Sequence, residues 1–136
     1  MSDCIFCKII AGEIPSATVY EDDACKAILD VNPAAKGHVI VLTKEHAEDV
    51  FHISDEALSN AICAAKKVAA ALKKTYQCDG VNILQNNGEV AGQTVFHLHI
   101  HVIPRFKGDS ISMHWKPGEM PSDLAETAEK IKANME

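Results

Sequence analysis

The sequence predicts an α+β fold, in which an antiparallel sheet of about five strands carries one long helix on one face. Three strand-like segments come first, then a long segment with helical periodicity, then two more strand-like segments. The strand-like segments span residues 16–23, 25–31, 37–44, 80–85 and 92–105. The chain has 136 residues, of which 47% are hydrophobic and 24% charged, so we expect a single domain over residues 1–136.

The long helix is expected to begin after Ser54, which can cap a first turn that holds Asp55 and Glu56. Lys73 and Lys74 carry the charge that suits a helix C-terminus, so the helix is expected to end near them. Apolar residues recur at helical spacing between these ends: Leu58, Ala61, Ile62, Ala65, Val68, Ala69 and Leu72. A short C-terminal helix is expected over residues 122–134, with Ser122 as its cap.

Charge and composition exclude several classes of protein. The formal net charge of −6 does not suit a surface for DNA or RNA polymers, although a single nucleotide could still bind in a pocket. The chain has no run of about 18 apolar residues, and its first residues do not resemble a signal peptide, so we expect a cytoplasmic protein without a membrane partner. Five cysteines, an odd number, fit a reducing compartment, and Cys25, Cys63 and Cys78 resemble small buried apolar residues.

Three of the seven histidines lie at every second position of the predicted strand over residues 92–105. Side chains alternate between the two faces of a strand, so His97, His99 and His101 would share one face. The other face would carry Phe96, Leu98, Ile100 and Val102. The first and third histidines would lie roughly 13 Å apart at Cα, so one metal ion could reach two of them but hardly all three. A site that only binds metal would therefore leave one histidine without a role.

A neutral imidazole is a nucleophile near pH 7 and needs no separate base, so attack on phosphorus is chemically reasonable. Residues 86–94, ahead of the histidines, suit a phosphate: Asn86, Gln93 and Thr94 offer side-chain donors, and Gly88 and Gly92 allow close approach of backbone amides. The sequence contains neither a P-loop motif nor a compact acidic motif for Mg²⁺. Kinase or ATPase chemistry is therefore disfavoured, and we expect no requirement for Mg²⁺ or an organic cofactor.

Cys4 and Cys7 form the one C-x-x-C motif of the chain. By itself the motif is compatible with half of a zinc site, a redox pair or coincidence. A structural zinc site needs four ligands, so two more would have to come from elsewhere in the sequence.

The run His97-Leu98-His99-Ile100-His101-Val102-Ile103 resembles the signature of the histidine triad (HIT) superfamily of nucleotide hydrolases and transferases. The resemblance covers nearly the whole chain. The segments that resemble its Hint branch, including bacterial members, are CIFCKIIAGEIPSATVYEDD, AILDVNPAAKGHVIVLTKEH, AGQTVFHLHIHVIPR and SMHWKPGE. This resemblance implies a HIT-like fold. It also implies a homodimer in which the carboxy-terminal segment, with Trp115, reaches the site of the partner subunit.

The resemblance also implies roles for individual residues. His99 would be the nucleophile, supported by His97 and His101, with His38 as the fourth histidine of the site. Asn86, Gly92, Gln93 and Thr94 would contact the phosphate together with His99 and His101. Asp30 would hold the ribose hydroxyls, and Ile5, Phe6, Ile9, Ile28 and Val31 would surround a purine base. The implied ligands of a structural Zn²⁺ are Cys4, Cys7, His46 and His97.

Simpler roles exist for several of these residues. Asp30 precedes Asn32-Pro33 and could be a turn former, and His38 could be an interior histidine with satisfied hydrogen bonds. Phe6 and Ile9 would be ordinary core residues in most proteins.

The activity implied by the resemblance is hydrolysis of purine nucleoside 5′-phosphoramidates, such as AMP joined to an amine or to lysine, through a nucleotidyl-histidine intermediate. His101 favours hydrolysis, because the transferase branch characteristically has glutamine at that position. The alternatives are hydrolysis of dinucleoside polyphosphates of the Ap3A or Ap4A type and a nucleotide-binding module with little turnover.

Overall fold

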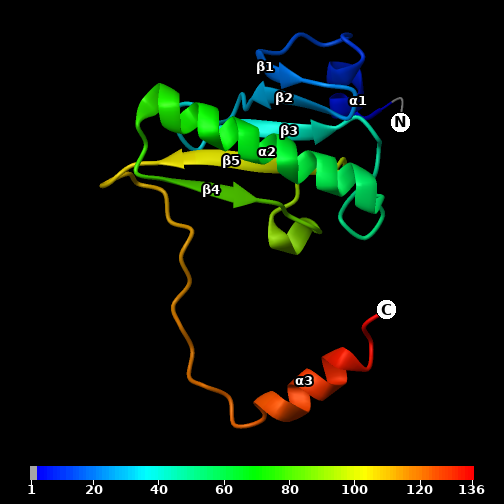
Figure 1. The fold of residues 1–136 in the computed structure, drawn as a ribbon, viewed down its shortest axis with the longest axis vertical. Helices are drawn as coiled ribbons and strands as arrows, with labels where there is room; N and C mark the ends of the chain where they lie inside the picture. Colours follow the sequence, from blue (N-terminus) through cyan, green and yellow to red (C-terminus); the bar gives the residue numbers. More distant parts are fainter. Residues whose placement is uncertain (1–2) are drawn as a thin grey trace.

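The computed structural model describes residues 3–136 and has the predicted α+β architecture (Figure 1). Strands β1 (Thr18–Glu21), β2 (Cys25–Leu29) and β3 (Val39–Thr43) precede the long helix α2 (Asp55–Tyr76). Strands β4 (Gly80–Leu84) and β5 (His99–Arg105) follow it. The five strands form one sheet in the order β1-β2-β3-β5-β4, and every neighbouring pair is antiparallel. The predicted fold class is therefore confirmed.

Helix α2 covers one face of the sheet and forms the main core with it (Figure 1). The Ser54 hydroxyl caps the helix as predicted, because it accepts a hydrogen bond of 3.1 Å from the backbone N–H of Ala57. Small residues on the inner face of α2 let the helix approach the sheet closely. The buried residues of this core are Cys25, Ala27, Val39, Val41, Ala61, Ala64, Ala65, Val68, Leu72, Leu98, Ile100 and Val102.

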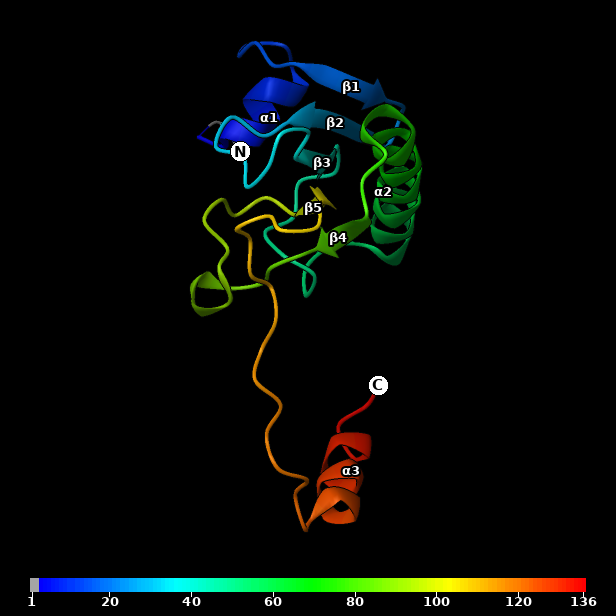
Figure 2. The same ribbon diagram turned by 90° about the vertical axis from the view of Figure 1, so that its left-hand side faces the viewer.

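A short helix, α1 (Ile5–Ile10), lies on the opposite face of the sheet from α2 (Figure 2). This helix was not predicted from the sequence, because six residues are too few to display a helical period. Its side chains Phe6 and Ile9 form a second, smaller core with Ile28 of β2 and with Ile40 and Leu42 of β3. This face of the sheet carries the histidines.

Several predicted boundaries were wrong. The histidine strand begins at His99 rather than near residue 92, because the chain bends through residues 95–97 before it joins β3. Helix α2 continues to Tyr76, where Gln77 adopts a left-handed conformation with φ of 49°. Helix α3 (Leu124–Lys132) begins after Asp123 instead of Ser122, and Asp123 makes no capping hydrogen bond through its side chain. Cys63 is exposed on α2, whereas Cys25 and Cys78 are buried as expected.

The chain beyond β5 leaves the sheet as an extended segment and ends in α3, which stands apart from the sheet in both views (Figures 1 and 2). None of the residues of α3 is buried. Among residues 3–136, no helix combines the length and the apolar character needed to cross a bilayer.

Gly37 is the tightest glycine position near the histidines, and we expect Gly37→Ala to destabilise the fold. Its φ is +90°, and a Cβ built on it would lie 2.6 Å from Cε2 of Tyr76. The backbone strain and the clash should together lower the free energy of unfolding by about 1–3 kcal/mol. Urea denaturation would measure the change. Gly12→Ala is the matched control, because Gly12 has a φ of +81° but no neighbouring atom within 4 Å of the added Cβ.

Candidate active site

The histidines lie on the face of the sheet that α1 covers. Alternation along β5 sends Ile100 and Val102 into the core under α2, so His99 and His101 point the other way. His97 precedes the strand but lies fully buried on the same side as His99, beside the ring of Phe6. Phe96 is 46% exposed and does not join the apolar face that was expected to contain it. The three imidazoles thus share one side, as the alternation predicted.

Hydrogen bonds fix the tautomer of His99. Its Nδ1 lies 2.7 Å from the carbonyl oxygen of His97, which can only accept, so the proton of the neutral ring is on Nδ1. Nε2 then carries a free lone pair. The pKa of His99 is lowered by burial, which keeps the ring neutral near pH 7. His99 therefore presents a neutral nitrogen nucleophile held in one orientation.

His38 and His101 form a directed chain of hydrogen bonds. The backbone N–H of Ala34 donates to Nδ1 of His38 at 2.9 Å, so the proton of that ring is on Nε2. This Nε2–H donates to Nδ1 of His101 at 2.9 Å, and it also lies 3.5 Å from a carboxylate oxygen of Asp30. The proton of His101 is consequently on its own Nε2. The chain ends in an N–H donor next to His99, whose ring centroid lies 5.0 Å from that of His101.

The fold keeps His38 and His101 uncharged. The pKa of His101 is lowered to about 4, mainly by burial and in addition by the neighbouring His99 and His38. Burial also lowers the pKa of His38, although the charge of Asp30 opposes that change. Both rings therefore act as neutral hydrogen-bonding groups near pH 7.

These lowered pKa values predict that acid destabilises the protein. Between pH 6.5 and about pH 4 the unfolded chain binds a proton at His101 that the folded chain does not, so stability should fall as the pH is lowered. The lowered pKa of His38 acts in the same direction. Each such group contributes up to about 1.4 kcal/mol per pH unit. Urea denaturation of the wild type and of His101→Gln at pH 7 and pH 4.5 would measure it. A loss of stability as steep in the variant as in the wild type would contradict the assignment to His101.

A cavity of about 530 Å³ opens beside His99 and His101, which is within the usual size range for small-molecule sites. Its walls are mostly apolar, and its few polar groups come from the histidines, Asp30 and neighbouring loop residues. The predicted residues that line it are Ile5, Phe6, Ile9, Ile28, Asp30, Val31, His38, Thr94, His99 and His101. Their exposed fractions range from 4% for Ile28 to 89% for Val31.

Sequence analysis missed other members of this wall, among them Ile14, Pro33, Ile40 and Val95. Ile40 had a usable signal, because it lies two residues after His38 in a strand and therefore on the same face. Ile14 and Val95 come from loops and had none. Asp30 combines both of its expected roles: it lines the cavity, and its Oδ1 accepts a hydrogen bond from the backbone N–H of Asn32 at 2.8 Å in a turn.

Four of the residues predicted to bind the nucleotide do not line the cavity. Gln93 is buried, and its amide bonds the backbone: Oε1 accepts from Gly88 N–H, and Nε2 donates to the carbonyls of Glu48 and Val95. It organises the loop, and these bonds occupy the amide that was expected to face a phosphate. Asn86 and Gly92 lie together at the base of the same loop. Trp115 is 82% exposed on the carboxy-terminal segment.

The predicted zinc ligands meet in one cluster. The ligand atoms of Cys4, Cys7, His46 and His97 all lie within 4.8 Å of one another. Nδ1 of His97 lies 3.1 Å from Nδ1 of His46, 3.3 Å from Sγ of Cys4 and 3.6 Å from Sγ of Cys7. Tetrahedral zinc with ordinary bond lengths would place such atoms about 3.3–3.8 Å apart.

The tautomer of His97 also fits a metal. Its Nε2 donates to the carbonyl oxygen of Thr43 at 2.6 Å, so Nδ1 directs a lone pair into the cluster. Two thiols and two imidazoles are a donor set that zinc prefers. The four side chains therefore fit a closed, structural zinc site.

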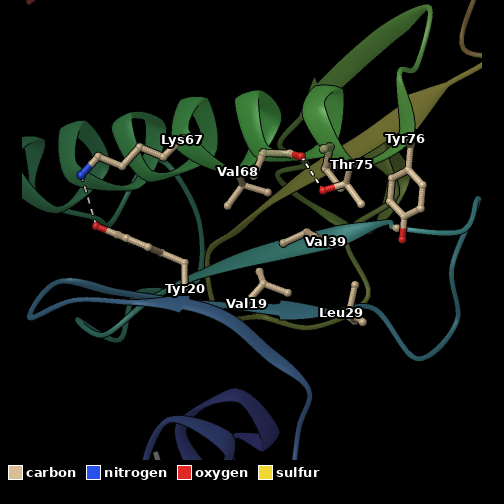
Figure 3. A pocket seen from close by; sticks show the side chains of 11 residues that line it. Val19, Tyr20, Leu29, Val39, Lys67, Val68, Thr75 and Tyr76 are labelled. Carbon is tan, nitrogen blue, oxygen red and sulfur yellow. Dashed lines mark hydrogen bonds between the residues drawn. The ribbon is translucent and has the colours of Figure 1, made fainter.

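A second cavity, of about 290 Å³, lies on the α2 side of the sheet (Figure 3). Valine, leucine and tyrosine side chains dominate it, and a hydrogen bond of 3.3 Å joins Lys67 to the hydroxyl of Tyr20 at one end. Histidine and cysteine are absent from its walls. Of these two cavities, the first is therefore the one whose wall carries imidazoles suited to attack on phosphorus.

The family profile of the HIT domain matches residues 11–108 of the chain. The chain belongs to the HIT domain family. A HIT relative from Bacillus subtilis, named Protein hit, is 46% identical over 133 residues, which cover 95% of this chain and 92% of the relative. The adenosine 5′-monophosphoramidase HNT1 of Saccharomyces cerevisiae is 39% identical over 135 residues, which cover 98% of this chain and 83% of the relative.

Solved HIT structures agree with the architecture. The crystal structure of a HIT family member from Bacillus subtilis matches with a TM-score of 0.91 and 44% identity, covering 98% of each chain. A zinc-bound histidine triad family protein from Mycobacterium smegmatis matches with a TM-score of 0.79 and 34% identity, covering 98% of this chain and 99% of that one. The resemblance found in the sequence, the HIT superfamily with its Hint-like branch, is thereby confirmed.

Proposed function

We propose that this HIT protein hydrolyses purine nucleoside 5′-phosphoramidates through a nucleotidyl intermediate on His99. The observation that carries the proposal is the bond from Nδ1–H of His99 to the His97 carbonyl, which leaves Nε2 unprotonated beside a cavity large enough for a nucleotide. The 39% identical yeast relative named as an adenosine 5′-monophosphoramidase supports the choice of substrate class.

In the first step, Nε2 of His99 attacks phosphorus, a new N–P bond forms and the P–N bond to the leaving amine breaks. The amine must leave with a proton. The Nε2–H of His101 lies next to His99, and the negative charge of a bound phosphoryl group raises the pKa of His101, so that His101 and His38 together carry one extra proton when substrate is bound. Transfer of the Nε2 proton to the amine then leaves both rings neutral. In the second step, water attacks phosphorus and gives its proton to the neutral pair of His101 and His38, the bond to His99 breaks and the nucleoside monophosphate is released.

The substrate would be held mainly by contact. Ile5, Phe6, Ile9, Ile28 and Val31 would enclose the base, and the carboxylate of Asp30 would accept hydrogen bonds from the ribose hydroxyls. Thr94 would donate to the phosphate, while Gln93, Asn86 and Gly92 shape the loop that presents it.

We propose three further properties of the protein: a zinc site, a dimeric state and a cytoplasmic location. Cys4, Cys7, His46 and His97 would bind zinc, which when present would cross-link α1 to the start of the catalytic strand; the zinc-bound Mycobacterium smegmatis neighbour supports this. A homodimer in the cytoplasm is proposed, formed by the single HIT domain of residues 1–136. The carboxy-terminal segment exposes several apolar residues, which supports its being covered by the partner subunit. These residues are Trp115, Met120, Leu124 and Ile131.

The test is steady-state release of AMP from adenosine 5′-phosphoramidate, beside release from diadenosine polyphosphates at equal concentration. We expect the phosphoramidate to be the better substrate by kcat/KM. Faster cleavage of the polyphosphates would reassign the substrate class, and binding of AMP without turnover of either would leave a binding module.

A further inference from the structure

Helix α1 connects the cluster of Cys4, Cys7, His46 and His97 to the wall of the cavity. Cys4 and Cys7 direct their sulfur atoms into the cluster with His46 and His97. Ile5, Phe6 and Ile9, on the same six-residue helix, form part of the wall of the cavity. The position of this wall therefore depends on how the first turn of α1 is held.

A helix of six residues has no stability of its own in water, so its position depends on tertiary contacts. Residues at its two ends contact the rest of the protein differently. Phe6 and Ile9 pack on the sheet, and the carbonyl of Ile9 accepts a hydrogen bond of 3.2 Å from Nζ of Lys26. The first turn is attached through sulfur-to-nitrogen contacts of 3.3–3.6 Å to His46 and His97.

Phe6 carries the connection to the nucleophile. Its ring lies edge-on to His97, with centroids 5.9 Å apart, and edge-on to His99, with centroids 5.0 Å apart. Phe6 is 8% exposed and lies between Cys4, the cap of the helix, and Cys7 in the sequence. A shift of the first turn would move this ring and with it the surface that meets a base.

The orientation of His99 does not depend on the cluster in the same way. Its Nδ1–H bonds the backbone carbonyl of His97, and not the imidazole of His97 that faces the cysteines. Loss of the cluster should therefore disturb the binding wall while the tautomer of the nucleophile persists.

From these contacts we propose that Cys4 and Cys7 are positioning residues for the nucleotide. Metal held by the cluster fixes α1 and thereby sets the affinity for the nucleotide. The reactivity of His99 does not depend on the metal. This inference rests on the proposed function, since it assigns the cavity to a nucleotide.

The test is the Kd of AMP, measured by isothermal titration calorimetry, for protein stripped of metal and for the same protein reloaded with one equivalent of Zn²⁺. We expect stripping to raise Kd at least about tenfold, because three wall side chains must then be ordered by the ligand itself. In turnover the effect should appear in KM, with kcat changed no more than about twofold. Hydrogen exchange of the amides of α1 should be faster in the stripped protein.

The variant Cys4→Ser distinguishes the role of Cys4 as a metal ligand from its role as the cap of α1. Sγ of Cys4 caps α1 by accepting from the backbone N–H of Cys7 at 3.3 Å, and a serine hydroxyl caps at least as well. The variant should show the high Kd of the stripped protein whether or not Zn²⁺ is added. Cys63→Ser, on the exposed surface of α2, is the control and should respond to Zn²⁺ like the wild type.

Three results would be decisive. Equal Kd values for AMP in the stripped and reloaded wild type would overturn the inference while leaving the proposed function intact. Failure of the wild type to take Zn²⁺ from a chromophoric chelator would overturn it too. Failure of the reloaded wild type to bind AMP at all would sink the proposed nucleotide function itself.

Discussion

Replacement of His99 by alanine should reduce release of AMP from adenosine 5′-phosphoramidate by at least about a thousandfold, because the variant has no atom to form the intermediate. The neighbouring histidines cannot substitute for it. Nδ1 of His101 accepts the bond from His38, and Nδ1 of His97 faces the cysteines. AMP affinity should change little, since the apolar wall and Asp30 remain in place.

Metal content and a surface variant provide the controls. His99 is not part of the cysteine cluster, so zinc content should be the same in His99→Ala and in the wild type. His52→Ala should retain full turnover, because His52 is exposed and bonds Asp49 at 2.6 Å outside the cavity. Turnover of His99→Ala within tenfold of the wild type would refute the nucleotidyl-histidine mechanism.

Replacement of His101 by glutamine is expected to slow the reaction according to the leaving group. Glutamine keeps an N–H donor for the phosphoryl group but cannot give a proton to a departing amine. For adenosine 5′-phosphoramidate we expect kcat to fall about a hundredfold or more, which is the usual contribution of a general acid. For the p-nitrophenyl ester of AMP, whose phenolate leaves without a proton, the loss should be less than about tenfold.

Comparison of the two substrates in one variant distinguishes the loss of a proton donor from a misfolded site. A misfolded or misaligned site would lower kcat for both substrates by the same factor. Equal losses of kcat for the two substrates would therefore show that His101 is not the proton donor and acts only as a structural partner of His38.

The parts of this molecule that follow a period were predictable from the sequence. The two-residue period placed His99 and His101 opposite Ile100 and Val102, and the helical period with Ser54 located α2. These signals are repeated over several residues, so single exceptions such as the exposed Ile62 do not obscure them.

The parts that depend on one tertiary contact were not predictable from pattern. Helix α1 is capped by a cysteine, which is not a usual capping residue, and it is ordered by contacts with segments far along the chain. The tautomers of the histidines depend on which carbonyl or N–H lies 2.6–2.9 Å from each ring nitrogen. Gln93 was expected to face a phosphate because its side-chain amide can donate hydrogen bonds. In the folded protein the side chain is buried, and its amide donates to a backbone carbonyl instead.

The place of β5 in the sheet also bears on the order in which the protein folds. β5 has β4, its neighbour in sequence, on one side, and β3, from which the whole of α2 separates it, on the other. Pairings between distant segments form slowly, because a long loop must close before any contact is gained. His99 lies opposite Leu42 of β3, so we expect the proposed nucleophile to reach its place only when this pairing forms. A compact intermediate limited to α2 and the pair of β4 with β5 would hold His99 and His101 without His38, whose ring bonds His101, and we expect it to be catalytically inert.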